Sequence, residues 1–173
     1  MRLSLVSAAA LSVAAFVGAG ACAHAEPTPI PTGPSEAAPP QPATSCAQVL
    51  AGALTPTGSA PTGNNLHLLQ CSDGIWQPFA DPYPSSDRWL TTGGELVLHG
   101  QGRRNPEAKA GTWTASPQTS EARCSAESVD VIGAGRTSAP QTYSSDAGRS
   151  LTFEVSDHMF TVKLSGYCLW QRG

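Results

Sequence analysis

The fold class of this chain is decided by two runs near its end, Leu151-Thr152-Phe153-Glu154-Val155 and Met159-Phe160-Thr161-Val162-Lys163-Leu164. In both runs apolar and polar side chains alternate, which is typical of a β-strand with one buried face. The short connection Ser156-Asp157-His158 predicts that the two strands pair as a hairpin. If the same alternation continues, Cys168 and Trp170 also lie on the buried face.

Four weaker runs of strand character lie upstream: Leu66–Cys71, Glu95–Gly100, Gly111–Ala115 and Ser128–Ile132. Charged residues make up only 13% of the chain, whereas Gly, Thr and Ser are plentiful, which favours a β-rich domain over a helical bundle. About six short strands predict a mainly β fold, either a small antiparallel sandwich or a partly open barrel.

One short N-terminal helix is predicted ahead of the strands. Ser45 and Gln48 have the spacing of a capping box, in which each side chain reaches the backbone N–H of the other residue. The apolar residues of this segment share one helical face: Cys46, Val49, Leu50 and Leu54. Pro56 ends the helix, because the residue before a proline is disfavoured in helical geometry.

The start of the chain has the layout of a secretory signal peptide. Arg2 precedes an apolar stretch from Leu3 to Ala21, and Ala23-His24-Ala25 is a small-x-small cleavage site. We therefore expect residues 1–25 to direct export and then to be removed. Export takes the chain out of the reducing cytosol, so its cysteines are expected to pair.

A second processing route stays open, because Ala19-Gly20-Ala21-Cys22 is similar to a bacterial lipobox, although Ala19 stands where Leu is usual. On this route a diacylated Cys22 becomes the N-terminus and anchors the protein to a membrane. The part that follows has no apolar run near the ~20 residues of a membrane-spanning helix. We thus expect either a secreted protein beginning at Glu26 or an envelope lipoprotein whose lipid is its membrane contact.

Residues 26–44 hold seven prolines and no aromatic residue, so they predict an extended, disordered tether. A proline-rich ligand segment is the alternative. Residues 45–173 are expected to form a single β-rich globular domain, monomeric in solution. Loss of the signal peptide leaves nine Lys and Arg against thirteen Asp and Glu, a net charge of −4 that disfavours nucleic acid as a partner.

Four cysteines remain in the domain: Cys46, Cys71, Cys124 and Cys168. In an exported protein this number predicts two disulfides. The most local arrangement joins Cys46 to Cys71 and Cys124 to Cys168, although four cysteines allow three connectivities. No Cys-x-x-Cys motif is present, which favours structural bridges over a redox pair.

Residues 73–90 predict a rigid loop rich in proline and aromatic residues. Aromatic rings stack on sugars, and Asp and Arg side chains form hydrogen bonds with hydroxyl groups. The candidate ligand contacts are therefore Trp76, Phe79, Tyr83, Asp87, Arg88 and Trp89. The alternative is that Trp76 and Trp89 seal the end of the core.

No pattern predicts a metal ion or another cofactor. The histidines of the domain, His67, His99 and His158, lie far apart, and the aspartates at 73, 81 and 87 lack the spacing of a calcium-binding loop. A Gly-x-Ser-x-Gly motif is also absent, so no catalytic residue is assigned.

The layout resembles the small exported proteins and lipoproteins of actinobacteria, mycobacteria in particular. The resemblance is carried by Ala23-His24-Ala25-Glu26-Pro27, by the Pro/Thr-rich tether and by a compact domain with paired cysteines. The segment from Gly111-Thr112-Trp113 through Cys124 to Ser165-Gly166-Tyr167-Cys168-Leu169-Trp170 is similar to the end of small β-domains in such proteins. The resemblance implies export and supports a Cys124–Cys168 pairing. Proteins of this type mostly have no assigned activity, so it implies no catalytic residue.

The sequence therefore favours a non-enzymatic exported module of the cell envelope, with a binding or structural role and an unidentified ligand or partner. One alternative is a secreted inhibitor or host-facing ligand that uses a rigid loop such as residues 78–88. Another is a small secreted hydrolase, for which His99, Asp87 and a nearby Ser are the residues to inspect. That alternative requires His99 to lie within hydrogen-bond reach of a carboxylate or hydroxyl group.

Overall fold

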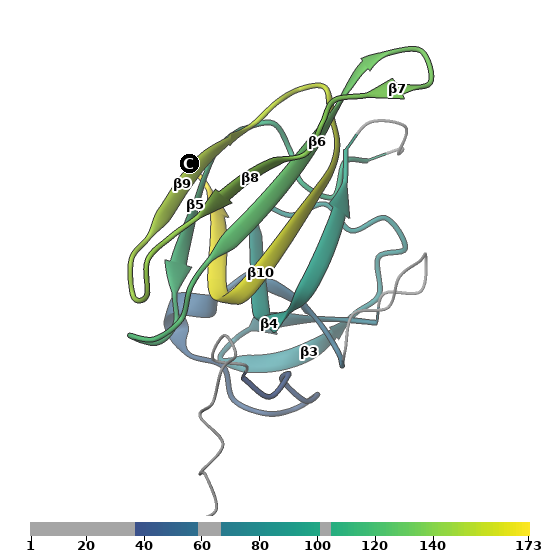
Figure 1. Cartoon of the computed structure of the whole chain (residues 1–173). Coiled ribbons are helices and arrows are strands. Elements are labelled where there is room, and N and C mark those ends of the chain that lie inside the picture. The colour runs from purple at the N-terminus through teal and green to yellow at the C-terminus, as the bar shows by residue number, and fades with distance from the viewer. Residues whose placement is uncertain (1–36, 59–66, 101–104) are drawn as a thin grey trace, which may run out of the picture. The chain divides into compact units, whose positions relative to one another are not determined.

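The computed structural model describes residues 37–58, 67–100 and 105–173. The predicted signal peptide, Cys22 and residues 26–36 of the predicted tether lie outside these ranges. The described residues form ten strands and one single-turn 3₁₀ helix, and they contain no α-helix (Figure 1). The elements are η1 (Gln48–Leu50), β1 (Leu54–Pro56), β2 (Leu68–Ser72), β3 (Ile75–Phe79), β4 (Arg88–His99), β5 (Gly111–Pro117), β6 (Ser125–Gly133), β7 (Arg136–Thr137), β8 (Gln141–Ser144), β9 (Leu151–Val155) and β10 (Met159–Arg172).

The ten strands form one mixed sheet in the order β3-β2-β1-β4-β10-β5-β9, and β6 branches from β10 together with β7 and β8. Most neighbours are antiparallel, but β1 runs parallel to β4, with Leu54 opposite Trp89. The prediction of a mainly β fold is confirmed. The expectation of a purely antiparallel sheet is wrong, because the chain passes through β2 and β3 before β4 pairs with β1.

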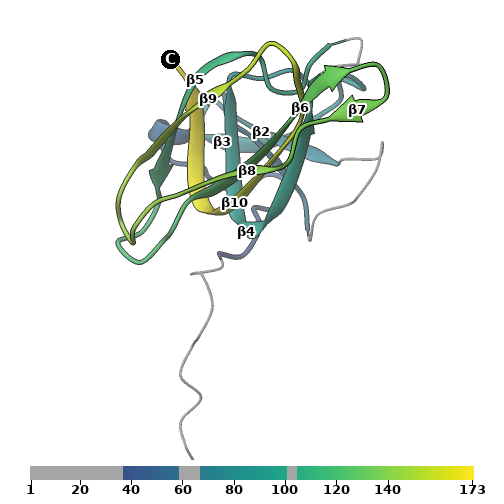
Figure 2. The same cartoon turned by 45° about the horizontal axis from the view of Figure 1, so that its top comes forward.

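Strand β10 connects the two branches of the sheet (Figure 2). Along one edge it pairs with β4, and along the other its residues 159–165 pair with β6 and its residues 168–172 with β5. The change of partner occurs at Gly166, where φ is 94° and the register against β4 shifts. A Cβ at this position would lie 1.9 Å from the carbonyl oxygen of Arg123, so the bend requires glycine.

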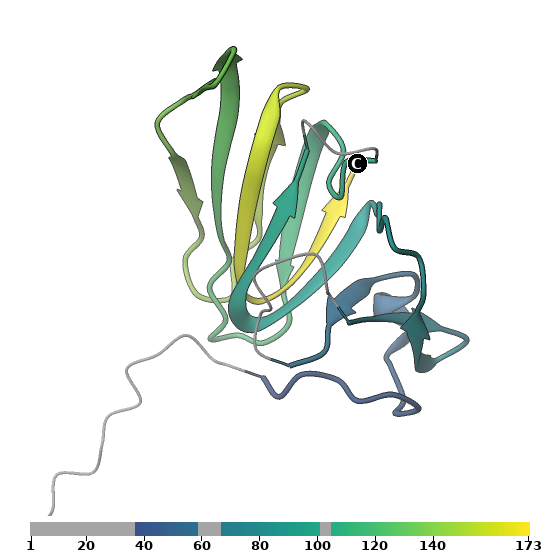
Figure 3. The same cartoon turned by 90° about the vertical axis from the view of Figure 1, so that its right-hand side faces the viewer.

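Two buried clusters share β4 and β10. The larger contains three fully buried tryptophans, Trp89, Trp113 and Trp170, and the smaller contains Trp76. Trp89 and Leu90 are neighbours on β4 but belong to different clusters, because successive side chains of a strand point to opposite faces. Figure 3 shows the η1–β3 region and the β6–β8 branch at opposite ends of this arrangement.

Both predicted disulfides, Cys46–Cys71 and Cys124–Cys168, are confirmed. The first joins the segment before η1 to β2. The second joins Cys124, just before β6, to the half of β10 that pairs with β5, so it ties the two branches together inside the core. Two disulfides are typical of an oxidising, extracytoplasmic environment. Among the residues described, no helix is long and apolar enough to cross a membrane.

The predicted N-terminal α-helix is wrong. The chain makes one 3₁₀ turn at η1 and then extends into β1, with Gly52 at a φ of 78° between them. Ser45 forms a bridge with Ile75 instead of capping a helix. The disulfide at Cys46 and the place of Leu54 in β1 bring both ends of this segment to the sheet, and these contacts override the helical pattern.

The two runs that decide the fold class are confirmed as strands, but their pairing as a hairpin is wrong. β9 pairs with β5, and β10 begins between β4 and β6. Alternation identifies the buried face of a strand and leaves its partner unspecified.

The expected loop at residues 73–90 also contains β3 and the start of β4. Its first residues, Asp73-Gly74, both have positive φ and form the turn of a β2–β3 hairpin.

Residues 37–44, which the sequence assigns to the tether, have backbone contacts with the sheet. The N–H of Ala37 donates to the carbonyl of Thr92, and the N–H of Ala43 donates to the carbonyl of Trp76, each at 2.8 Å. Backbone hydrogen bonds with the sheet are thus present from Ala37 onward, ahead of the expected domain start at Ser45.

Candidate functional site

Two loops are fastened to each other, and we call them the two-loop surface: residues 80–87 between β3 and β4, and residues 105–110 before β5. The N–H of Ser86 donates to the carbonyl of Glu107 at 3.3 Å. The indole N–H of the buried Trp89 lies 3.2 Å from the carbonyl oxygens of both Ser86 and Glu107. The tryptophan therefore holds the two loops from beneath.

Glu107 fixes the second loop to the end of β4. Its carboxylate oxygen Oε2 accepts the backbone N–H of His99 at 2.7 Å and lies 3.0 Å from His99 Nδ1. The backbone N–H of Glu107 donates in return to the carbonyl of His99. Glu107 is only 7% exposed, so these bonds compensate the cost of burying its carboxylate. The His99 side chain is one-third exposed, so its ring borders solvent beside this buried carboxylate.

Asp87 fixes the first loop to the end of the chain. Arg172 Nε donates to Asp87 Oδ1 at 2.8 Å, and Lys109 Nζ lies 3.4 Å from Asp87 Oδ2. The hydrogen bond from Arg172 lowers the pKa of Asp87 most; burial opposes this shift, and Lys109 adds to it. The side chains of Asp87 and Lys109 are 42% and 44% exposed, so the surface presents both signs of charge to solvent.

The aromatic residues of the candidate segment divide into buried and exposed. Trp76 and Trp89 are 3% and 0% exposed, so in this structure their rings are not available for stacking and they occupy the core positions of the alternative interpretation. Phe79 is half-buried against the larger cluster. Tyr83 is 49% exposed, and its backbone N–H is bound by Asp81 Oδ1 at 2.8 Å in a side-chain turn that stiffens the loop.

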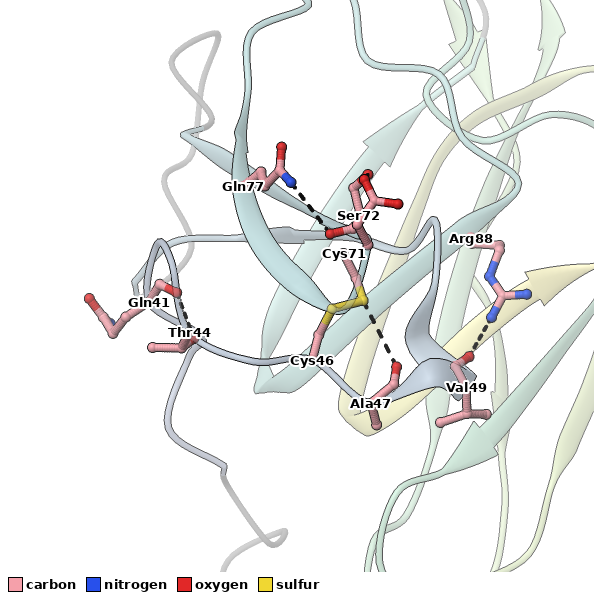
Figure 4. The surroundings of a disulfide bond; sticks show 10 residues. Gln41, Thr44, Cys46, Ala47, Val49, Cys71, Ser72, Gln77 and Arg88 are labelled. Atoms are coloured by element: carbon pink, nitrogen blue, oxygen red, sulfur yellow. Dashed lines mark hydrogen bonds between the residues drawn. A yellow bond between two sulfur atoms is a disulfide. The ribbon is translucent and has the colours of Figure 1, made fainter.

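Arg88 contacts a different part of the molecule. Its Nη2 donates to the carbonyl of Val49 in η1 at 2.6 Å (Figure 4). Its Nε is buried and has no hydrogen-bond partner among the described residues. Asp87 therefore contacts Lys109 and Arg172, whereas Arg88, the next residue in the sequence, contacts η1.

The residues named for a hydrolase are only partly brought together. His99 has a carboxylate partner, as that hypothesis requires, but the partner is Glu107 and not Asp87. The nearby Ser86 donates its hydroxyl to the carbonyl of Arg88 and accepts the N–H of the same residue. Within the described ranges, no hydrogen bond joins His99 to Asp87 or to a serine. A carboxylate partner can orient an imidazole, and here the Glu107–His99 contacts also hold the loop at residues 105–110 against the end of β4.

The other predicted positions lie elsewhere. His67 is exposed before β2, and His158 Nε2 lies 3.5 Å from Asp157 Oδ1 just before β10. In the part of the chain that the structure describes, no three His, Cys, Asp or Glu side chains are placed to hold a metal ion.

Sequence reasoning missed Glu107, Lys109 and Arg172 as members of this site. Lys109 is 22 residues from Asp87 and Arg172 is 85 residues from it, so no local spacing signals their association.

No family model, curated protein or solved structure matches this chain. Its function is therefore inferred from the residues themselves.

Proposed function

We propose that this protein is an exported, non-enzymatic module of the cell envelope that binds an envelope component through the two-loop surface. The observation that carries the proposal is the mutual fastening of the two loops by buried or paired side chains, which leaves polar and aromatic groups partly exposed: Tyr83, Asp87, Lys109 and His99. Loops held in place before binding lose little conformational entropy on binding. A surface that carries an exposed tyrosine and charges of both signs suits a polar ligand such as a wall glycan.

Export is supported by the two disulfides, by the signal-like start of the chain and by its resemblance to small exported actinobacterial proteins. Intact mass of the natively exported protein, with and without reduction, tests this part. A chain that begins at Glu26 and gains the hydrogens of two disulfides on reduction is a secreted protein. Acyl chains on Cys22 identify an envelope lipoprotein, which fits the same role at a membrane surface. An unprocessed chain confined to the cytosol would overturn the proposal.

Binding is tested by retention of the purified protein on isolated cell-wall and membrane fractions. We expect Tyr83→Ala and Lys109→Ala each to reduce retention about tenfold, as contacts in a ligand site do. Ile132→Ala is the matched control, because Ile132 is 59% exposed on β6. Equal retention of all variants would show that the envelope is bound elsewhere, and no retention of the wild type would remove the binding role.

A second candidate, a secreted inhibitor or host-facing ligand, is favoured by the rigidity of residues 78–88. The side chains of Asp81 and Ser86 each close a turn in this segment. Pro84, which lies between these two residues in the sequence, is buried. Inhibition of an extracellular hydrolase by the wild type, lost in Tyr83→Ala, would establish this function in place of envelope binding.

We also infer that the two branches of the sheet enclose a partly open barrel. The rings of Tyr143 in β8 and Phe153 in β9 have centroids 5.3 Å apart, which supports an approach of the two branches at this point. In the described sheet β8 pairs with β6 and β9 with β5, so the two strands are not joined by ladder hydrogen bonds.

A further inference from the structure

Residues 37–46, which we call the strap, begin beside β4, where the N–H of Ala37 donates to the carbonyl of Thr92, and reach the open edge of strand β3 at residues 43–46. The N–H of Ala43 donates to the carbonyl of Trp76, the N–H of Trp76 donates to the carbonyl of Thr44, and the N–H of Cys46 donates to the carbonyl of Gly74, each at 2.8 Å. The strap therefore occupies backbone groups of an edge strand that would otherwise be unpaired.

The part of the strap that leads to β3 has little buried side-chain surface. All of its residues from Gln41 to Ser45 are exposed, and Ala43 has an unfavourable φ of 64°. The chain beyond it is held differently, because Leu50 and Ala53 are buried in the smaller cluster. A segment with exposed hydrogen bonds and little buried apolar surface opens easily, so the strap depends on a further constraint.

That constraint is the Cys46–Cys71 disulfide, which joins the end of the strap to β2 (Figure 4). Cys71 keeps its place without the bridge, because its N–H donates to Ala53 and its carbonyl accepts from Gly52. Cys71 is buried but Cys46 is half-buried, whereas Cys124 and Cys168 are both fully buried, so only the first bridge has a partly exposed cysteine. The two disulfides thus differ in access to a thiol from solution.

We propose that Cys46–Cys71 is a redox-sensitive catch whose reduction releases the strap and uncovers the edge of β3. The reductant is a dithiol. Its first thiolate attacks Cys46 Sγ, a mixed disulfide forms, and Cys71 leaves as a thiolate that takes up a proton. The second thiol then displaces Cys46, so the dithiol ends as a disulfide and the protein gains two electrons and two protons. This device is independent of the two-loop surface.

The experiment uses the oxidised exported protein, dithiothreitol under native conditions and timed alkylation with peptide mapping. We expect Cys46 and Cys71 to be alkylated about tenfold sooner than Cys124 and Cys168, because access limits the exchange. In urea, where all sulfurs are accessible, this difference should disappear. Simultaneous loss of both disulfides under native conditions would overturn the proposal.

Hydrogen exchange of the partly reduced protein tests the release itself. Peptides that contain Ala43, Cys46 and Trp76 should lose protection, while those of β4 and β10 keep it. Unchanged protection after Cys46–Cys71 is reduced would overturn the proposal. The double variant Cys46→Ser with Cys71→Ser should show the same released state without reductant. If that variant does not fold, the wild-type exchange experiment decides alone.

Discussion

At Gly166 the backbone has a φ of 94°, and an added Cβ would lie 1.9 Å from the carbonyl oxygen of Arg123. Gly166→Ala forces an unfavourable φ and a clash with backbone at the point where β10 changes partner. We expect it to lower the free energy of unfolding by about 3 kcal/mol or more. Urea denaturation measures this, with Gly133→Ala as the control, because nothing lies within 4 Å of its Cβ position. Equal stability of the two variants would contradict the account of the bend.

Asp87 makes a contribution to stability that depends on pH. Its pairing with Arg172 and Lys109 lowers its pKa in the folded state, so the unfolded chain binds a proton at higher pH than the folded chain does. The stabilisation is therefore present above the unfolded pKa near 4 and is lost as pH falls through the lower folded pKa. The carboxylate is 42% exposed, so we expect solvent screening to limit the effect to about 0.5–1 kcal/mol.

Acid titration of stability in Asp87→Asn and Asp146→Asn measures this contribution. The first variant should lose less stability than the wild type between about pH 4 and pH 2, because it lacks the group that titrates. Asp146 is the control, since its side chain is 92% exposed and lies 3.8 Å from its cationic partner. Parallel acid curves for Asp87→Asn and the wild type would show that the pairing adds no stability.

Among the elements, β6 and β10 depend on the buried Cys124–Cys168 disulfide. It closes a loop of 44 residues, which in the chain-entropy model stabilises the folded state by about 4 kcal/mol. We expect replacement of both cysteines by alanine to lower the free energy of unfolding by this amount, measured by urea denaturation. A loss below about 1 kcal/mol would show that the bridge adds little to the packing of the two branches.

The strands show what alternation and local spacing can and cannot predict. The runs at 151–155 and 111–115 fall within β9 and β5, since a buried face imposes period two on the sequence. Their pairing with each other was not predicted, because contacts between strands far apart in sequence leave no local signal. The helix expected at Ser45 failed for the same reason, as a disulfide and a strand contact override local propensity.

For the whole molecule, the disulfides were more predictable than the site. The expectation of export predicted paired cysteines, and four cysteines allow three connectivities, of which the most local one is present. Asp87 and Tyr83 were named as candidates because they lie in a segment rich in proline and aromatic residues. The partners of Asp87, Lys109 and Arg172, come from two other parts of the chain. Glu107 holds its loop through a buried carboxylate, and no sequence pattern around it predicts that burial. The fold assembles the site, so its members could not be predicted without the sheet order.

The two core clusters should unfold together, because β4 and β10 contribute side chains to both. All four tryptophans of the chain are buried, Trp76 in the smaller cluster and the other three in the larger. In the oxidised protein we expect tryptophan emission and far-UV circular dichroism to report one coincident urea transition. Trp76→Phe removes the signal of the smaller cluster and should leave the shape of the transition unchanged. An earlier emission change that disappears in this variant would show that the region around β3 unfolds separately from the rest of the sheet.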